Sequence, residues 1–249
     1  METPADQIET FLAAWKHEVW GFVIYRCTYT SDNDFIAFIS HIKNLTLENL
    51  EIYGADVRLL AQQLSWKVVE DRESLEGASK ADVRRSFDEW CQSPEAAAEH
   101  PESSHTVAES QNARYRFCMH VDLASLDSFT GSRQPWVNLI LRRWPYDADL
   151  HDEDDDEDEN DGDDEGLDEI EGSTAEDVGW CKIAISGLLP DTFAHLCHPN
   201  AWYRVYQRPP AVVGRSSKHK SRLQLRSRPR WERTVPTISL PGSTRARIC

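Results

Sequence analysis

An acidic run from Asp147 to Asp177 divides this chain. The run contains nineteen Asp and Glu with no Lys or Arg, whereas the whole chain of 249 residues has a formal net charge of −16. Its centre, Asp152 to Gly166, has no apolar side chain. Burial therefore cannot offset the roughly 1–2 kcal/mol that ordering the backbone of each residue costs. We expect residues 147–177 to be a disordered insertion within a single domain that spans residues 1–207.

Part of this run nearly matches a calcium-binding loop. An EF-hand loop takes oxygen ligands at fixed positions, with Asp at the first and a bidentate Glu at the last. Here Glu stands first and Asp stands last, and a run this acidic produces such near matches by chance. The sequence therefore predicts a solvated loop with weak, non-specific cation binding and no metal site. The five residues that match the frame are Glu157, Glu159, Asp161, Gly162 and Asp168.

The chain from Arg208 to Cys249 has the opposite charge. It holds eleven Lys and Arg against one acid, Glu232. We expect a disordered basic tail, and three interpretations of it stay open. Its clusters suit the phosphates of nucleic acid or a nuclear import receptor. Alternatively, the tail contacts the acidic run of the same chain, a contact that salt would weaken.

The remaining residues have the pattern of a folded domain. Apolar residues make up 40% of the chain, which contains nine Trp residues. Alternating and β-branched stretches predict about five strands, and runs of helical periodicity mostly precede them. We therefore expect an α+β fold with a largely antiparallel sheet, helices packed on one face, and a ferredoxin-like arrangement as the first topology. The expected strands are residues 21–30, 66–71, 115–122, 136–144 and 178–186.

The strands on either side of the acidic run allow a specific prediction. If they belong to one sheet, they are expected to be antiparallel neighbours, as consecutive strands often are. Their apolar sides must then face the same way, because a slip of one residue would expose one of them. The two apolar sets are Val137, Leu139 and Leu141, and Cys181, Ile183 and Ile185.

Several stretches in this order resemble a family of uncharacterised proteins from filamentous ascomycete fungi. The resemblance covers most of Trp20 to Pro210. It implies a fungal source and a common fold, and it assigns no catalytic residue. The stretches that carry it are WGFVIYRCTYT, LSWKVVEDRESLEGASKADVRRSFDEW, RYRFCMHVD, WVNL, DVGWCKI and HPNAWYRVYQRPP.

Polar residues on the predicted strands are the main candidates for a site. If the strands pair suitably, these residues converge into a cationic patch able to hold an anion or a carboxylate. His120 could act as an acid or base near neutral pH, with Asp122 two residues further along the same face. The alternative is an ordinary solvated sheet face with unrelated polar groups. The candidate ligand-binding residues are Arg26, Asn138, Arg142 and Lys182.

A second candidate is the stretch His195-Leu196-Cys197-His198, which has three metal-ligating side chains. A structural zinc site usually needs a second pair of ligands, and none is visible, so we interpret Cys197 as a buried thiol beside surface histidines. The common nucleotide-binding, zinc-protease and hydrolase motifs are absent, and the sequence predicts no cofactor. The N-terminal residues lack a secretory pattern, so we expect an intracellular protein, cytoplasmic or nuclear, without a membrane segment.

These observations support three hypotheses about function. The first is a non-enzymatic binding or interaction protein, whose partner is an unknown protein or a small anionic ligand. The second is an enzyme of unknown reaction that uses the polar face around His120. The third is weak nucleic-acid association through the basic tail. A shaped pocket around His120 would favour the enzyme, and a flat polar face would favour the interaction protein.

Overall fold

A single mixed sheet forms the centre of the fold in a computed structural model, which describes residues 2–53, 57–102, 106–107, 110–144 and 167–214. The strand order across the sheet is β2-β1-β3-β4-β5-β6. β1 is parallel to both of its neighbours, β3 to β5 alternate in direction, and β6 is parallel to β5. The strands are β1 (Val23–Arg26), β2 (Val68–Val69), β3 (Phe117–Val121), β4 (Trp136–Leu141), β5 (Trp180–Ala184) and β6 (Val212–Val213).

Helices connect and cover these strands. The longest, α2, places five buried apolar side chains on one stripe at helical spacing. The helices are α1 (Pro4–Trp15), α2 (Asp32–Tyr53), α3 (Val57–Gln63), α4 (Arg72–Leu75), α5 (Lys80–Cys91), α6 (Pro94–Ala98), α7 (Ala113–Arg116), α8 (Leu123–Gly131), α9 (Phe193–Leu196) and α10 (Trp202–Val205), with the short turns η2 (Ile185–Gly187) and η3 (Leu188–Thr192) between β5 and α9.

The strand directions differ from the sequence-based prediction. Helices and a sheet are present, but the sheet is not largely antiparallel, because three of its five pairings are parallel. A ferredoxin-like sheet, with antiparallel neighbours throughout, is therefore wrong for this chain. The physical reason lies in the connections. Helices α2 and α3 carry the chain from the end of β1 back to its start, and such a crossover makes β2 parallel to β1.

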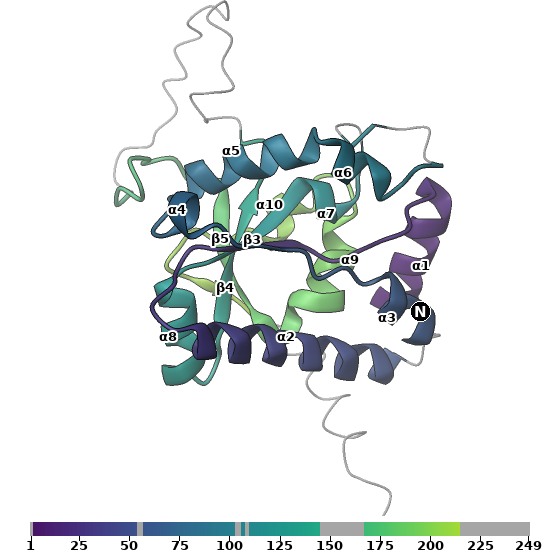
Figure 1. The fold of residues 1–249 in the computed structure, drawn as a ribbon, viewed down its shortest axis with the longest axis horizontal. Helices are drawn as coiled ribbons and strands as arrows, with labels where there is room; N and C mark the ends of the chain where they lie inside the picture. The colour runs from purple at the N-terminus through teal and green to yellow at the C-terminus, as the bar shows by residue number, and fades with distance from the viewer. Residues whose placement is uncertain (1, 54–56, 103–105, 108–109, 145–166, 215–249) are drawn as a thin grey trace, which may run out of the picture. The chain divides into compact units, whose positions relative to one another are not determined.

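Helices cover both faces of the sheet, so the prediction of helices on one face was also wrong. Along β1, Ile24 belongs to an apolar cluster with α1, α2 and α9, whereas Val23 and Tyr25 belong to a second cluster with α5. Figure 1 shows α2 and α5 on opposite sides of the sheet. All four residues of β1 are buried, as expected for a strand that is covered on both faces.

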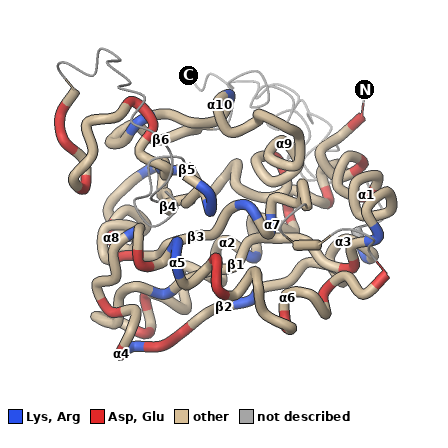
Figure 2. Tube along the Cα trace, turned by 90° about the horizontal axis from the view of Figure 1, so that it is seen from above, with Lys and Arg blue, Asp and Glu red and all other residues tan. Residues whose placement is uncertain are grey.

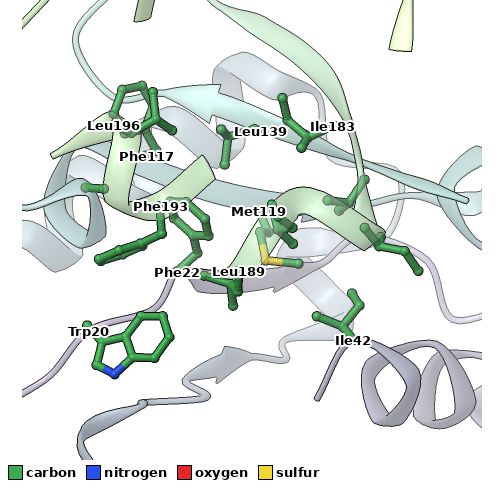
Figure 3. Packing of buried hydrophobic residues seen from close by; sticks show 14 of the residues in the cluster. Trp20, Phe22, Ile42, Phe117, Met119, Leu139, Ile183, Leu189, Phe193 and Leu196 are labelled. Carbon is green, nitrogen blue, oxygen red and sulfur yellow. The ribbon is translucent and has the colours of Figure 1, made fainter. Parts of the chain in front are cut away.

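The larger cluster fills the side of the sheet that faces α2. Figure 3 shows Phe22, Met119 and Leu139 from neighbouring parts of the sheet, together with Leu189 and Phe193 from the chain after β5. Phe193 packs its ring edge against Phe22, with ring centroids 5.1 Å apart. Each such side chain contributes about 1.5–3 kcal/mol when it is fully buried. The chain on both sides of residues 145–166 thus contributes to one core.

The predicted pairing of β4 with β5 is confirmed. The two strands are antiparallel neighbours, with Val137 opposite Ile183 and Leu139 opposite Cys181. All four of these side chains are buried in the larger cluster. The common burial of the two apolar sets therefore fixes the register, as expected for strands with one face in a core.

A capping box starts α5. The Ser79 hydroxyl accepts from the Asp82 backbone N–H at 3.1 Å, and the Asp82 carboxylate accepts from the Ser79 backbone N–H at 3.2 Å. This reciprocal pair is a capping box, which satisfies two backbone donors that the helix itself cannot. It fixes the segment just before the helix, and that segment forms one wall of the site described below.

The fold extends beyond both predicted domain limits. Residues 167–177 were predicted to belong to the disordered insertion, yet Asp177 accepts from the Trp202 indole N–H at 2.7 Å. Beyond the predicted end at Gln207, β6 pairs with β5, and Arg208 donates to the backbone oxygen of Ala175 at 3.0 Å. The described residues belong to one compact unit, residues 1–215. The predictions for residues 145–166 and 215–249 lie outside the described residues.

Among the described residues, none of the helices has the length and apolar character needed to cross a bilayer.

Candidate functional site

Three of the predicted site residues lie in one row across the sheet. His120 on β3 is opposite Asn138 on β4, and Asn138 is opposite Lys182 on β5. Because side chains alternate along a strand, all three point to the side of the sheet that carries α5. The structure therefore brings these three residues together, as the sequence pattern suggested for suitably paired strands.

Arg26 does not join this row. It follows Ile24 on the opposite face, and its guanidinium lies over the Phe35 ring of α2, 4.5 Å from the centroid. It donates to the backbone oxygen of Thr28 and forms an ion pair with Asp32. Arg26 therefore links the end of β1 to the start of α2.

Arg142 points to the α5 side but lies at the other end of the strands. Its Nε atom is 2.5 Å from Oδ1 of Asp88 on α5, and a second nitrogen donates to the backbone oxygen of Tyr115 at 3.4 Å. The predicted cationic patch is thus divided between three places. Only Lys182 remains as a cation in the row that contains His120.

A pocket of about 580 Å³ opens where β3 ends and α8 begins. Its walls come from three parts of the chain: the end of β1, the segment between α4 and α5, and the turn from β3 into α8. A fourth contribution, Glu171, comes from the described end of the acidic run. The lining residues with polar or reactive side chains are Cys27, Thr28, Glu76, Ser79, Lys80, His120, Asp122 and Glu171.

His120 is buried at the base of this pocket, and both ring nitrogens have partners. Nε2 lies 3.0 Å from the backbone oxygen of Ala78, so this nitrogen carries the proton. Nδ1 then accepts from the side-chain amide of Asn138 at 3.2 Å. Burial lowers the pKa of His120, against the opposing effects of the Ala78 hydrogen bond and the Asp122 charge. The ring is therefore neutral at pH 7 and ties β3 to the segment before α5.

Asp122 is the N-cap residue of α8. Its Oδ1 accepts from the backbone N–H and the hydroxyl of Ser125, at 2.8 and 2.7 Å. Its Oδ2 accepts from Asn138 at 3.0 Å. Burial alone would raise the pKa of Asp122, but the Ser125 hydrogen bonds and the electrostatic effects of His120 and Lys80 outweigh it, so the pKa is lowered. Asp122 is thus a structural carboxylate with both oxygens engaged.

Lys80, the first residue of α5, closes the pocket over this network. Its ammonium lies 2.7 Å from Oε1 of Glu171, 3.7 Å from Oδ2 of Asp122 and 4.5 Å from the centroid of the Trp180 ring. On the neighbouring part of the same face, Lys182 lies over the Trp136 ring at 4.2 Å. Burial lowers the pKa of Lys182, which the charge of Asp122 partly offsets.

The thiol that lines the pocket, Cys27, is not an activated nucleophile. Burial, with a further contribution from the charge of Asp122, raises the pKa of the Cys27 thiol to about 12. A thiol must ionise to attack, so Cys27 is unreactive near neutral pH. Its hydrogen points to the backbone oxygen of Tyr25, 3.8 Å from the sulfur. Cys27 therefore acts as a small apolar side chain.

The formal charge of the pocket is negative. Glu76, Asp122 and Glu171 contribute three carboxylates, and Lys80 contributes one cation to the lining. This is the reverse of the cationic patch predicted from the strands. Within residues 2–214, as far as the structure describes them, no group of three His, Cys, Asp or Glu side chains is arranged to hold a metal ion. In the His195–His198 stretch, Cys197 is buried, His195 is half-buried and His198 is exposed.

Sequence reasoning missed Lys80 and Glu171. Lys80 directly follows the capping Ser79 at the start of α5, and nothing in its local sequence marks it as part of a site. Glu171 lies among many carboxylates, so nothing in its local sequence distinguishes it from its neighbours. The fold brings Lys80 and Glu171 together, although they are 91 positions apart in the sequence.

Comparisons with known proteins found no matching family model, no matching curated protein and no matching solved structure.

Proposed function

We propose that this chain is a non-enzymatic binding protein, and that the pocket at the end of β3 binds a positively charged group of a ligand or of a partner protein. One observation carries the proposal. His120 and Asp122, the two residues best suited to acid–base chemistry, use their ring nitrogens and carboxylate oxygens for internal hydrogen bonds. A general acid or base must instead reach a proton of the substrate.

The charge of the lining supports a cationic ligand. An ammonium or guanidinium group would lie beside the exposed carboxylates of Glu76 and Glu171, whose present partners are Arg72 and Lys80. A carboxylate or phosphate would face the same two groups with only Lys80 to attract it, and Lys80 is already paired with Glu171. Charge complementarity of this kind governs selectivity more than raw affinity. The proposal therefore replaces a small anionic ligand with a cationic one.

The proposal also includes the source and location of the protein. The ordered stretches that resemble the fungal family support a fungal origin. The cysteines support an intracellular setting, because five of them are free and buried among the described residues. Free thiols are usual where the compartment is reducing.

The test is a titration of the full chain with N-methylguanidinium chloride, followed by backbone amide shifts in NMR spectra. We expect saturable shifts at Gly77, Ala78 and Lys80, and none with sodium chloride at equal ionic strength. Glu171→Gln should weaken binding at least about threefold, the order expected for one partly exposed charge pair. Glu169→Gln is the matched control, since Glu169 is exposed on the same segment and does not line the pocket.

Two results would contradict the proposal. One is equal binding by the Glu171→Gln and Glu169→Gln chains, which would assign the effect to the acidic run in general. The other is saturable binding of sodium acetate at the same amides with no response to N-methylguanidinium. That result would restore the anionic ligand predicted from the strand residues.

A further inference from the structure

A second pocket lies at the opposite end of β3 from the His120 site. Its volume is about 200 Å³, and it is formed where α7 enters β3 and where the chain leaves β4. Three arginines line it: Arg116, Arg142 and Arg143. The two stretches that supply them, α7 and the residues directly after β4, can be followed among the blue segments of Figure 2.

The lining of this pocket contains no carboxylate. Its other polar members are Ser110, Gln111 and Tyr115. Arg116, Arg142 and Arg143 give the lining residues a formal charge of +3, in a chain whose net charge is −16. Such a local reversal of charge is costly unless each cation has a partner, because like charges in a confined, partly buried volume repel.

Only one of the three arginines has a carboxylate partner within the described part of the chain. Arg142 forms its ion pair with Asp88 through Nε, which neutralises that charge. Arg116 donates to the backbone oxygen of Leu196 at 3.0 Å, and no carboxylate approaches it among the described residues. Burial lowers the pKa of Arg116, as expected for a cation withdrawn from water without a counter-charge.

The other polar groups are arranged to donate rather than to accept. Arg143 is exposed and has no ion pair among the described residues. The Ser110 hydroxyl oxygen accepts from the backbone N–H of Asn112 at 3.0 Å, which leaves its hydrogen available to a ligand. Ser110 itself is buried. Arg116, Arg143 and Ser110, whose side chains can all donate, thus line the same pocket.

We propose that this pocket is an oxyanion site that binds a phosphate or carboxylate group between Arg116 and Arg143, with Ser110 as a third donor. Guanidinium groups bind both anions through paired N–H donors, so the chemistry is shared. The anion has two possible sources. It is either a separate phosphate-bearing molecule, or a carboxylate from the acidic run, which follows Arg143 closely in sequence.

The first experiment is a calorimetric titration of the full chain with inorganic phosphate at low ionic strength in a chloride buffer. We expect saturable binding of one phosphate per chain. Arg143→Gln should weaken it at least about fivefold, which corresponds to a charge-assisted hydrogen-bonded contact. Arg133→Gln removes the same charge from an exposed arginine that does not line the pocket, and it should leave the affinity unchanged.

The second arm repeats the titration on a chain in which the acids between 152 and 166 are replaced by Asn and Gln. Equal phosphate affinity in both chains would identify a separate molecule as the source. Binding that appears only after this replacement would show that carboxylates of the chain itself occupy the arginines. In either case Arg143→Gln must reduce the binding.

Two outcomes would overturn the proposal. One is the absence of saturable phosphate binding in both chains, and the other is equal affinity in Arg143→Gln and Arg133→Gln. Arg143→Lys provides a further check, since it keeps the charge but loses the paired N–H donors of the guanidinium. This variant should bind phosphate with intermediate affinity. Arg143 is exposed, so these variants are expected to fold, and circular dichroism melts would confirm it.

Discussion

The side-chain amide of Asn138 lies 3.0 Å from Oδ2 of Asp122, and through this contact β4 holds the first turn of α8 in place. The same amide lies 3.2 Å from Nδ1 of His120. A single buried side chain therefore sets the orientation of both residues that a catalytic interpretation would need. This arrangement makes Asn138 the most informative position at which to test whether the network is structural.

Replacing Asn138 with Ala is expected to destabilise the fold by about 1–3 kcal/mol, because it leaves buried acceptors on His120 and Asp122 without their donor. Urea unfolding at pH 7 measures the effect. Asn138→Asp should cost more, since it places a second carboxylate beside Asp122, and part of that loss should be recovered in acid. An Asn138→Ala chain as stable as the wild type would show that the network contributes nothing to folding.

The lowered pKa of His120 predicts a specific pH dependence of stability. The unfolded chain binds a proton on this residue near pH 6.5, whereas the folded chain resists protonation to a lower pH. The stabilising contribution is therefore complete above about pH 6.5. It is lost progressively as the pH falls from there towards the folded pKa, since the unfolded state then holds more protons.

This contribution can be isolated by unfolding titrations between pH 5 and pH 8. His120→Gln should remove part of the loss of stability on the acid side, whereas His41→Gln, a half-buried histidine on α2, should leave it in place. His195 has a pKa lowered by burial and contributes in the same direction, so the difference from the wild type is the quantity to compare. An unchanged slope in His120→Gln would contradict a neutral, buried ring.

Gly21 is expected to tolerate no side chain. Its φ is +97°, and an added Cβ would lie 2.7 Å from Cδ1 of Leu64 and 3.0 Å from the backbone oxygen of Ser65. Gly21→Ala should lower the thermal midpoint, with a loss of roughly 1–3 kcal/mol from strain and overpacking. Gly131→Ala is the control, because nothing lies within 4 Å of its added Cβ. It should be neutral or slightly stabilising at the end of α8.

Ile183→Asp is expected to prevent folding. Ile183 lies opposite Val137 in the centre of the larger cluster, so the change would bury a charge without a partner. Lys182→Gln, one residue away on the opposite face, should cost less than about 1 kcal/mol through its lost contact with Trp136. Soluble expression and a near-ultraviolet circular dichroism spectrum separate the two outcomes. A folded Ile183→Asp chain would contradict the observed register.

The positions of β1 to β5 were readable from the sequence, but β6 and the strand directions were not. Alternation along Phe117–Val121 and Trp136–Leu141 marks where a strand lies and which side chains share a face. Nothing in that alternation says which neighbour a strand pairs with. Arg26 is an example, because its side chain lies on the α2 side of the sheet, away from His120. Both sides of β1 are buried, so its alternation pattern did not show which side Arg26 shares with the other site residues.

The helix α8 was not predicted, and its composition explains why. Leu123–Gly131 contains several residues with weak helix propensity, including two serines, a threonine and a glycine. The helix forms because Asp122 caps its first turn and Leu126 packs into the core. Both effects depend on tertiary structure, and the same is true of the meeting of Lys80 with Glu171. Such contacts can be predicted from a single sequence only where a local motif accompanies them.

The place of β1 between β2 and β3 affects the order in which this protein can assemble during synthesis. One edge of β1 can pair only after residues 117–121 have been made, about 95 positions later. At translation rates of roughly 5–20 residues per second, that edge remains unpaired for about 5–20 s. An unpaired strand with Ile24 and Tyr25 is prone to self-association. Nascent chains shorter than this length are therefore expected to depend on chaperones.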